Sequence, residues 1–368
     1  MNRSFTSLVT LQFREVFREP DLIWWAFVIP IGLSWLLGIA IGASGSVPPS
    51  VGIVSEPAHE MESWRGWIEK VERGVSEGAF TRSPQSRFAK APANRAPIEF
   101  VPFSREEAIA ALKEGRISMF VERSGSGGLI YSFDPRNGEA QMTYLVMERA
   151  LGGAPGAPDR GEVVELQVQG TRYIDFLVPG LLAMGIMSSA LWGIGWALIE
   201  IRMKKLMRRM AATPLRKTMF LFSHFVTRLI VNGLEFIALY AFVAWYFGVK
   251  IQGNPAALLL VFVTGNMAFA GLAIFTSSRT NNPRVGNGVI NALTFPMTLL
   301  SGVFFSYHHF PSWSIPLVKA LPLTLLADSM RSVFNEGAGL AQVALPSLIL
   351  AAMGLALFYL GLKIFKWY

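Results

Sequence analysis

An ionisable side chain lies in the middle of an apolar run over residues 219–247. Glu235 stands near the centre of this run, with Asn232 close by and Arg228 two helical turns earlier on the same face. A charge at bilayer depth is costly, so this group is expected to face other helices and to be paired or protonated. Two roles stay open for the three residues: contact with cargo or a gating step, and a buried structural pair. No chain of acidic residues that could relay protons accompanies them, which disfavours an ion-driven carrier.

Residue types that perform catalysis are scarce in this chain. It contains no cysteine, which excludes disulfides, a thiolate nucleophile and a cysteine-based metal site. The histidines are His59, His224, His308 and His309; they lack metal-ligand spacing, and we assign them structural roles. Gly125–Gly128 opens no helix and indicates a turn rather than a phosphate-binding loop. The pattern GxxxxGK followed by Ser or Thr is absent, so this polypeptide is not expected to hold ATP in a P-loop, and we expect no metal or cofactor on it.

A basic, methionine-rich segment over residues 202–214 is predicted to form a short amphipathic helix that stops at Pro214. Apolar side chains recur at helical spacing on one face and cations flank them. The apolar face consists of Met203, Leu206, Met207 and Met210, and the cations are Lys204, Lys205, Arg208 and Arg209. One interpretation is an anchor on anionic lipid. The other is a docking helix whose adaptable methionines enter a groove of a partner.

Two further segments are predicted to act at the membrane surface. Residues 1–21 have an apolar face that includes Phe13 and Phe17, and they are predicted to form an interfacial helix. Residues 306–331 are apolar and aromatic but are interrupted by prolines, so we predict a re-entrant pair of short helices there. This second segment is interpreted either as an aromatic belt at the lipid headgroups or as a lid over an exit route.

The layout of apolar runs predicts an α-helical integral membrane protein with six transmembrane helices. A bilayer core about 30 Å thick needs about 20 apolar residues per helix. The chain is 52% hydrophobic and 16% charged, below the roughly 25% charged residues of soluble domains. The predicted spans are 22–43, 174–199, 219–247, 256–276, 287–305 and 342–363. The first stands alone, and the other five form a membrane domain over 172–368.

Loop charge predicts the orientation of these spans. With the N-terminus in the cytoplasm, the inside segments carry 14 Lys and Arg, whereas the short outside loops carry three. Cytoplasmic loops are enriched in these cations, so both termini are placed in the cytoplasm.

Residues 44–171 are predicted to form an inserted extracytoplasmic α/β domain. Residues 45–171 hold 14 Lys and Arg against 17 Asp and Glu, whereas the rest of the chain is strongly basic. Strand signals at 51–54, 98–103, 117–122 and 129–133 alternate with helix signals at 61–75, 104–114 and 139–150. The helix after Ser104 is expected to begin with a capping box completed by Glu107.

Several short motifs, taken in order, resemble the ABC-2 type (type V) exporter permeases that carry an external domain between the first two spans. VPFSREEAIAALKEGRISMFVE at 101–122 is similar to a strand–helix–strand pattern of that domain, and LVPG at 177–180 is similar to the opening of the second span. MRRMAATPLRK at 207–217 resembles the coupling segment of the family. The stretch before the last span resembles the family through SGVFF at 301–305, FPSW at 310–313, LPLT at 321–324, Asp328 and Arg331, and the tail through KIFKW at 363–367.

The resemblance implies a six-span half-transporter in a bacterial cell (inner) membrane. A second copy or a paralogue would complete the pore, and two ABC ATPase subunits would hold ATP and Mg²⁺ beneath it. A periplasmic adaptor or outer-membrane tunnel is a further expected partner, and nucleic acid is not. The resemblance assigns the ATPase-coupling residues as Arg202, Met203, Leu206, Met207, Arg208, Met210, Thr213 and Pro214, with Phe13 and Phe17 on the connecting helix. It assigns the extracellular gate residues as Phe304, Phe305, Phe310, Pro311, Trp313, Pro322, Asp328 and Arg331.

The function expected from these observations is the permease subunit of an ATP-driven exporter of an amphipathic or lipophilic compound, such as a drug-like molecule, lipid or glycolipid. ATPase closure would move segment 202–214 and the N-terminal helix, and so open the central cavity outward. The alternative is a non-transporting scaffold or sensor whose external domain binds an envelope partner. An intramembrane enzyme is disfavoured because no Ser/His or paired-Asp arrangement occurs within the spans.

Overall fold

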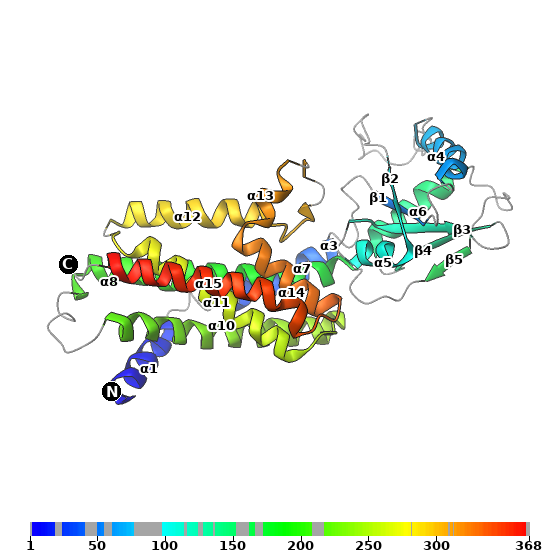
Figure 1. The fold of residues 1–368 in the computed structure, drawn as a ribbon. Helices are drawn as coiled ribbons and strands as arrows, with labels where there is room; N and C mark the ends of the chain where they lie inside the picture. Colours follow the sequence, from blue (N-terminus) through cyan, green and yellow to red (C-terminus); the bar gives the residue numbers. More distant parts are fainter. Residues whose placement is uncertain are drawn as a thin grey trace, which may run out of the picture. The chain divides into compact units, whose positions relative to one another are not determined.

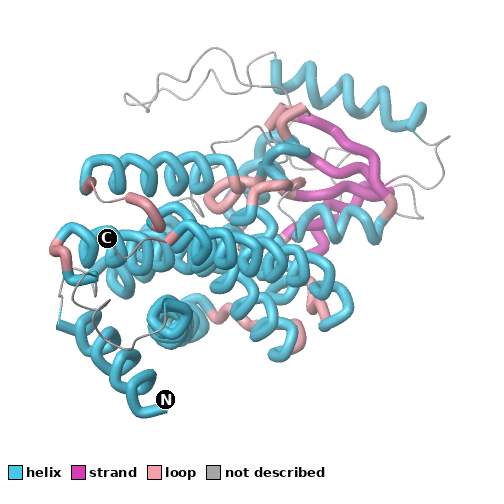
Figure 2. Tube along the Cα trace, turned by 60° about the vertical axis from the view of Figure 1, so that its left-hand side comes forward, coloured by secondary structure: helices cyan, strands magenta, loops and turns pink. Residues whose placement is uncertain are grey.

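The computed structural model separates into two compact units, one of residues 1–35 and 177–368 and one of residues 36–176. We call them the helical unit and the sheet unit. The structure describes residues 2–18, 24–40, 50–54, 61–76, 98–113, 116–123, 128–134, 137–151, 162–165, 172–207, 217–280, 282–307, 310–311 and 313–365. Figure 1 shows the order of the elements along the chain, and Figure 2 distinguishes helices from strands.

Four helical runs of the described chain are long and apolar enough to cross a membrane. They are Tyr173–Met203, Lys217–Phe247, Pro255–Ser277 and Leu340–Ile364. They coincide with the predicted second, third, fourth and sixth spans, which confirms those four as span candidates by length and composition. The first run consists of α7 (Tyr173–Ser188), a π-helical segment η3 (Ser189–Trp196) and α8 (Ala197–Met203); the other three are α10, α11 and α15.

The predicted first and fifth spans do not reach that standard. Within 22–43 the structure describes η1 (Trp24–Val28) and α3 (Ile29–Ala40), and the remaining residues of this prediction lie outside the described residues. The predicted fifth span was 287–305, but helix α12 (Pro283–Leu300) ends five residues earlier. The N–H of Ser301 donates to the carbonyl of Met297 (2.9 Å), and Gly302 has a φ of +67°. A left-handed glycine after the last turn ends a helix, so this boundary prediction was wrong.

Helices α11 (Pro255–Ser277) and α15 (Leu340–Ile364) form the closest helix pair of the helical unit. A Cβ on Gly271 would collide with the Gly354 carbonyl, and a Cβ on Gly354 would lie 2.5 Å from the Met267 carbonyl oxygen. Gly361 is similarly close to Phe275, with 3.1 Å to its Cα. Small residues let two backbones approach in this way, and dispersion between the helices then stabilises the pair. Because neither backbone can yield independently, the two helices behave as one rigid pair.

The remaining helices of the helical unit are α1 (Asn2–Arg18), α10 (Lys217–Phe247), α13 (Ile315–Lys319) and α14 (Pro322–Asn335). The segment predicted as a re-entrant pair of short helices therefore contains two helices, α13 and α14, of which α14 continues past residue 331. Proline stands at the start of each, where its missing N–H leaves no hydrogen bond unmade.

The sheet unit contains a five-stranded mixed sheet in the order β2-β1-β3-β4-β5. Strands β1 (Ser50–Val54), β2 (Glu99–Phe103) and β3 (Met119–Arg123) are parallel, β4 (Leu129–Phe133) runs antiparallel to β3, and β5 (Glu162–Glu165) pairs parallel with β4. The four strand signals of the sequence correspond to β1 to β4, whereas β5 was not predicted.

Helices cover both faces of this sheet, since its strands place apolar side chains on each face. On one face Ile53 and Met119 pack with Trp64 of α4 (Met61–Ser76) and Met147 of α6 (Gly138–Ala150). On the other face Phe120 packs against α5 (Arg105–Lys113).

The predicted capping box opens α5. The Glu107 carboxylate accepts from the Ser104 N–H at 3.0 Å, and the Glu107 N–H donates to Ser104 Oγ at 3.3 Å. This reciprocal pair satisfies two N–H groups that a helix start leaves open. The Ser104 N–H bond favours the charged carboxylate and lowers the pKa of Glu107.

Candidate functional site

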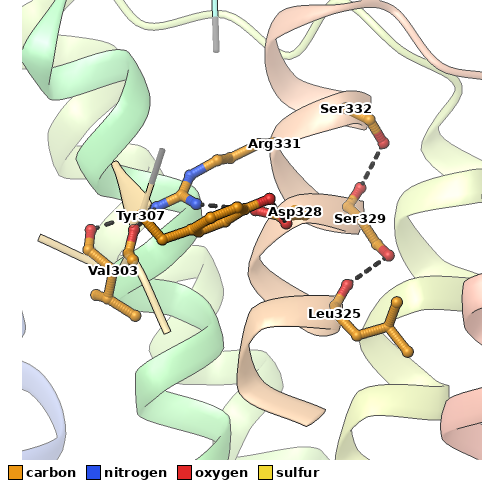
Figure 3. Close-up of polar contacts among 8 residues, drawn as sticks. Val303, Tyr307, Leu325, Asp328, Ser329, Arg331 and Ser332 are labelled. Carbon is orange, nitrogen blue, oxygen red and sulfur yellow. Dashed lines mark hydrogen bonds and ion pairs between the residues drawn. The ribbon is translucent and has the colours of Figure 1, made fainter. Parts of the chain in front are cut away.

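A buried arginine joins helix α14 to the turn that follows α12 (Figure 3). Arg331 is 7% exposed, and its Nη2 donates to the carbonyl oxygen of Gly302 at 2.6 Å, with a longer contact to that of Val303 at 3.4 Å. Its Nη1 donates to Asp328 Oδ1 at 3.1 Å, while Tyr307 Oη donates to Asp328 Oδ2 at 2.7 Å. A buried cation needs such partners, so these contacts fix the turn 302–307 against α14.

Gly180, in the LVPG motif of α7, lies directly against this turn. A Cβ at that position would stand 2.9 Å from the Val303 carbonyl oxygen and 3.1 Å from Arg331 Nη2. Only glycine lets α7 pass this close, so two motifs 120 residues apart in the sequence meet at one point.

The C-terminal end of α14 is also attached to the rest of the helical unit by hydrogen bonds. The N–H of Gln252 donates to the Phe334 carbonyl at 3.1 Å, and the N–H of Gly253 donates to the Val333 carbonyl at 2.9 Å. The loop between α10 and α11 thus caps carbonyls that the end of α14 leaves open. A Cβ on Gly253 would lie 2.6 Å from the Val333 carbonyl oxygen, which keeps this contact close.

The predicted gate residues fall into two groups. Asp328 and Arg331 belong to the Arg331 network on α14, and Pro322 opens that helix. The others precede α14 and include exposed aromatics: Trp313 is 77% exposed and Phe305 is 52% exposed. Phe304 and Phe310 are half-buried and Pro311 is exposed. The fixed part of the predicted gate is therefore α14, and the exposed part is the segment before it.

The predicted coupling helix does not begin as one continuous helix. Helix α8 ends at Met203, and Lys205 has a φ of +55°, a left-handed conformation that a non-glycine residue seldom adopts. Leu206 and Met207 are helical again after this break. The single face of Met203, Leu206 and Met207 was therefore a wrong prediction, because the periodicity cannot register one left-handed residue. Arg208, Met210, Thr213 and Pro214 lie outside the described residues.

Arg202, which precedes the break, binds the end of another helix. Its Nη1 donates to the carbonyl oxygens of Ser277 (2.6 Å) and Thr280 (2.7 Å), and its Nη2 donates to that of Ser278 (2.8 Å). These carbonyls form the C-terminal end of α11. The guanidinium carbon also lies 5.3 Å from the ring centre of Phe365, just after α15. A cation at a helix C-terminus satisfies open carbonyls and the helix dipole together.

The N-terminal helix α1 attaches to α10 through a residue that the sequence analysis did not single out. Gln12 is 8% exposed; its Nε2 donates to Ser223 Oγ at 3.1 Å, and its Oε1 accepts from Thr227 Oγ1 at 3.0 Å. Phe5 also stacks on Phe222 at 5.9 Å between ring centres. The available signal was a glutamine within an otherwise apolar helical face. Phe13 lies half-buried on this helix, and the side chain of Phe17 is outside the described residues.

Two of the three predicted intramembrane polar residues, Arg228 and Asn232, contact other helices from α10. The Arg228 guanidinium occupies the space that a side chain on Gly193 of η3 would fill. Asn232 Nδ2 donates to Asn266 Oδ1 of α11 at 2.5 Å, and Asn266 Nδ2 donates to the Phe262 carbonyl at 2.8 Å. Glu235 is partly buried on the same helix. The arrangement ties α10 to both η3 and α11.

The described part of the chain holds no group of three His, Asp or Glu side chains that could bind a metal ion. The contacts described above join one helix to another. Such contacts can transmit a displacement from one helix to the next.

Two comparisons with known proteins agree with this picture. A family model described as "ABC-2 type transporter" matches residues 141–335, which is more than half of the chain. ABC transporter G family member 20 of Dictyostelium discoideum is 25% identical over 174 residues, 46% of this chain and 23% of that protein. The chain thus matches about a quarter of the length of that relative. The matched region runs from α6 to the end of α14 and includes the hydrogen-bond partners of both Arg202 and Arg331, and on this match the chain belongs to the ABC-2 type transporter family.

Proposed function

We propose that this chain is the permease subunit of an ATP-driven exporter that moves an amphipathic or lipophilic compound out of the cytoplasm or the inner leaflet. The observation that carries the proposal is the family match over residues 141–335, combined with four helices that are long and apolar enough to cross a bilayer. The printed name of the relative supports an ABC transporter, but it names no cargo.

The exposed face of α12 supports a second copy of the chain as partner. Asn287 and Asn291 are both exposed on this helix, and Asn291 Nδ2 donates to Asn287 Oδ1 at 2.6 Å. Phe295, 68% exposed, follows one turn later. Amides that remain in lipid without further partners are unfavourable, whereas amides and small residues favour contact between helices. In the proposed dimer, this face of α12 lines the cargo path that lies between the two copies.

The proposal places ATP hydrolysis on a partner ATPase, two copies per dimer. The exposed Met203 and Leu206, with Lys204 and Lys205 between them, form an apolar and basic surface suited to a groove in such a partner. On this proposal the ends of α8 and α15 and helix α1 lie on the cytoplasmic side, in a bacterial cell membrane.

Purification and reconstitution of the full chain test the proposal. We expect a nucleotide-hydrolysing chain to co-purify from native membranes in mild detergent. We also expect the complex to move a fluorescent phospholipid or a fluorescent amphipathic dye across proteoliposomes only with MgATP. A complex that binds no ATPase, or that hydrolyses ATP without moving either probe, contradicts the exporter. Retention of an envelope protein by the sheet unit in that case favours the scaffold or sensor.

A further inference from the structure

The contacts of Arg202 converge on the rigid pair α11 and α15. Its two terminal nitrogens donate to three carbonyl oxygens at the C-terminal end of α11, those of Ser277, Ser278 and Thr280, at 2.6–2.8 Å. Its guanidinium lies over Phe365, which is buried immediately after α15. A single side chain at the end of α8 therefore contacts the ends of two other helices.

The same end of the two helices is joined by further hydrogen bonds. Ser278 Oγ donates to the Gly361 carbonyl of α15 at 3.0 Å, and Lys217 Nζ, at the start of α10, donates to the Phe365 carbonyl at 3.3 Å. Farther along, Gly271 and Gly354 bring the backbones of α11 and α15 into close contact. A displacement applied to Arg202 therefore acts on both helices at the same end.

The backbone after Arg202 is bent, and the side chains there are exposed. Helix α8 ends at Met203, Lys205 is left-handed, and the side chains of Met203 to Leu206 are exposed. Met207 is buried beyond this exposed stretch, and Lys204 pairs with Glu200 of α8 at 2.6 Å. A partner that docks on Leu206 or Lys204 thus pulls on a short bent segment, and Arg202 at its start connects that segment to the ends of α11 and α15.

We infer that Arg202 is a positioning residue that transmits displacement of segment 203–207 to the α11–α15 pair, which then moves as a single body. The inference rests on the proposed function for its driving force, the ATPase, but the attachment itself exists in the chain alone. It assigns α11 and α15 as the helices that the coupling segment drives.

Distance measurements between two spin labels test the attachment. Since the chain has no cysteine, Lys204→Cys and Lys363→Cys provide the only labelling sites, one on segment 203–207 and one near the end of α15. In the full chain in lipid nanodiscs we expect one narrow distance distribution. Loss of a hydrogen bond to a charged group shifts an equilibrium by about tenfold, so Arg202→Gln should raise the fraction of molecules outside that peak by about that factor.

A matched control separates this effect from a general loss of charge. Arg279 lies between Ser278 and Thr280 and is exposed, so Arg279→Gln removes a cation from the same helix end. Arg279→Gln should leave the distribution narrow, and Arg202→Lys should restore it in part because one ammonium replaces the planar fork. A distribution that stays narrow in Arg202→Gln, with an unchanged melting temperature, overturns the inference.

A second label pair tests transmission in the complex with the co-purified ATPase. Arg284→Cys on α12 and Lys363→Cys report movement of α15 relative to α12. Trapping with MgATP and vanadate should shift this distance in the parent chain but not with Arg202→Gln, while the ATPase still co-purifies. An equal shift in both contradicts the inference. If no ATPase co-purifies, the proposed function fails, and the first label pair still decides whether Arg202 holds the segment.

Discussion

Three arginines of the helical unit make different contacts; Arg331 is buried, whereas Arg202 and Arg228 are partly buried. Arg202 caps the end of α11, Arg331 holds the turn after α12, and Arg228 fills the space beside Gly193. The first two donate mainly to backbone carbonyls. Because a carbonyl contact does not depend on one complementary acidic residue, these ties are difficult to recognise as pairs in the sequence.

Loss of the Arg331 contacts should destabilise the helical unit more than loss of the phenol. Tyr307→Phe removes one hydrogen bond to Asp328 and should lower the free energy of unfolding by about 1 kcal/mol. Arg331→Met also leaves the Gly302 carbonyl without its donor, and should lower it by about 2–4 kcal/mol. Thermal unfolding in nanodiscs measures both, with the exposed Lys319→Met as control. Equal effects of the two variants would contradict the role given to the Gly302 carbonyl.

Protonation of Glu107 should open the first turn of α5. The pKa of this carboxyl is lowered in the folded state, so its stabilising contribution is complete above the unfolded pKa and is lost as pH falls through the lowered folded pKa. Ser104→Ala should cost about 1 kcal/mol at neutral pH. Amide hydrogen exchange of residues 105–108, corrected for intrinsic rates, measures the opening. Protection of residues 105–108 that stays constant through acid in the parent chain would contradict this role of the Glu107 carboxylate.

Glycine allows close contacts between helices in this protein. Composition alone does not predict where those contacts form. The four longest apolar runs were recognised because twenty apolar residues in sequence leave few alternatives. The end of α12 was misplaced because an apolar SGVFF continues past Leu300, whereas Gly302 turns the chain. The break at Lys205 and the π-helical segment η3 have no periodic signature, since each changes the backbone without changing residue type.

Replacement of glycine by alanine within a helix usually stabilises a protein. At the α11–α15 contact the same replacement should destabilise it. Gly354→Ala places a Cβ 2.5 Å from the Met267 carbonyl oxygen, and overpacking of this kind costs about 1–3 kcal/mol. Gly233→Ala on α10 meets nothing within 4 Å and should be neutral or stabilising by up to about 1 kcal/mol. Melting temperatures of the two variants in the same nanodiscs provide the comparison. A Gly354→Ala protein as stable as Gly233→Ala would show that the two helices can separate freely.

Helix α12 is buried along only a narrow stripe. Its buried positions are Gly286, Ile290 and Thr294, one turn apart, and the remaining faces are open. Of the predictions made from the sequence, the ATPase partner, the dimer and the cargo concern surfaces of this kind. These three depend on residues or atoms of other molecules, which the sequence of one chain does not contain.

Cysteine cross-linking should detect the second copy at α12. In the otherwise cysteine-free chain, Asn291→Cys is expected to form a disulfide-linked dimer in native membranes under mild oxidation. Ile237→Cys, equally exposed to the surroundings but on α10, should remain monomeric. Gel mobility without reductant reads out both. Dimers from Ile237→Cys and none from Asn291→Cys would move the proposed interface from α12 to α10.

The π-helical segment η3 separates α7 from α8 within one unbroken run. A π-turn contains one residue more than an α-turn, and each α-helical residue accounts for about 100° of rotation. Conversion of one such turn to α geometry therefore swivels α8 about its own axis without melting any part of the run. Such a rotation would separate Arg202 from the carbonyls of α11, so we expect the Arg202 hydrogen bonds to hold η3 in its π-helical form.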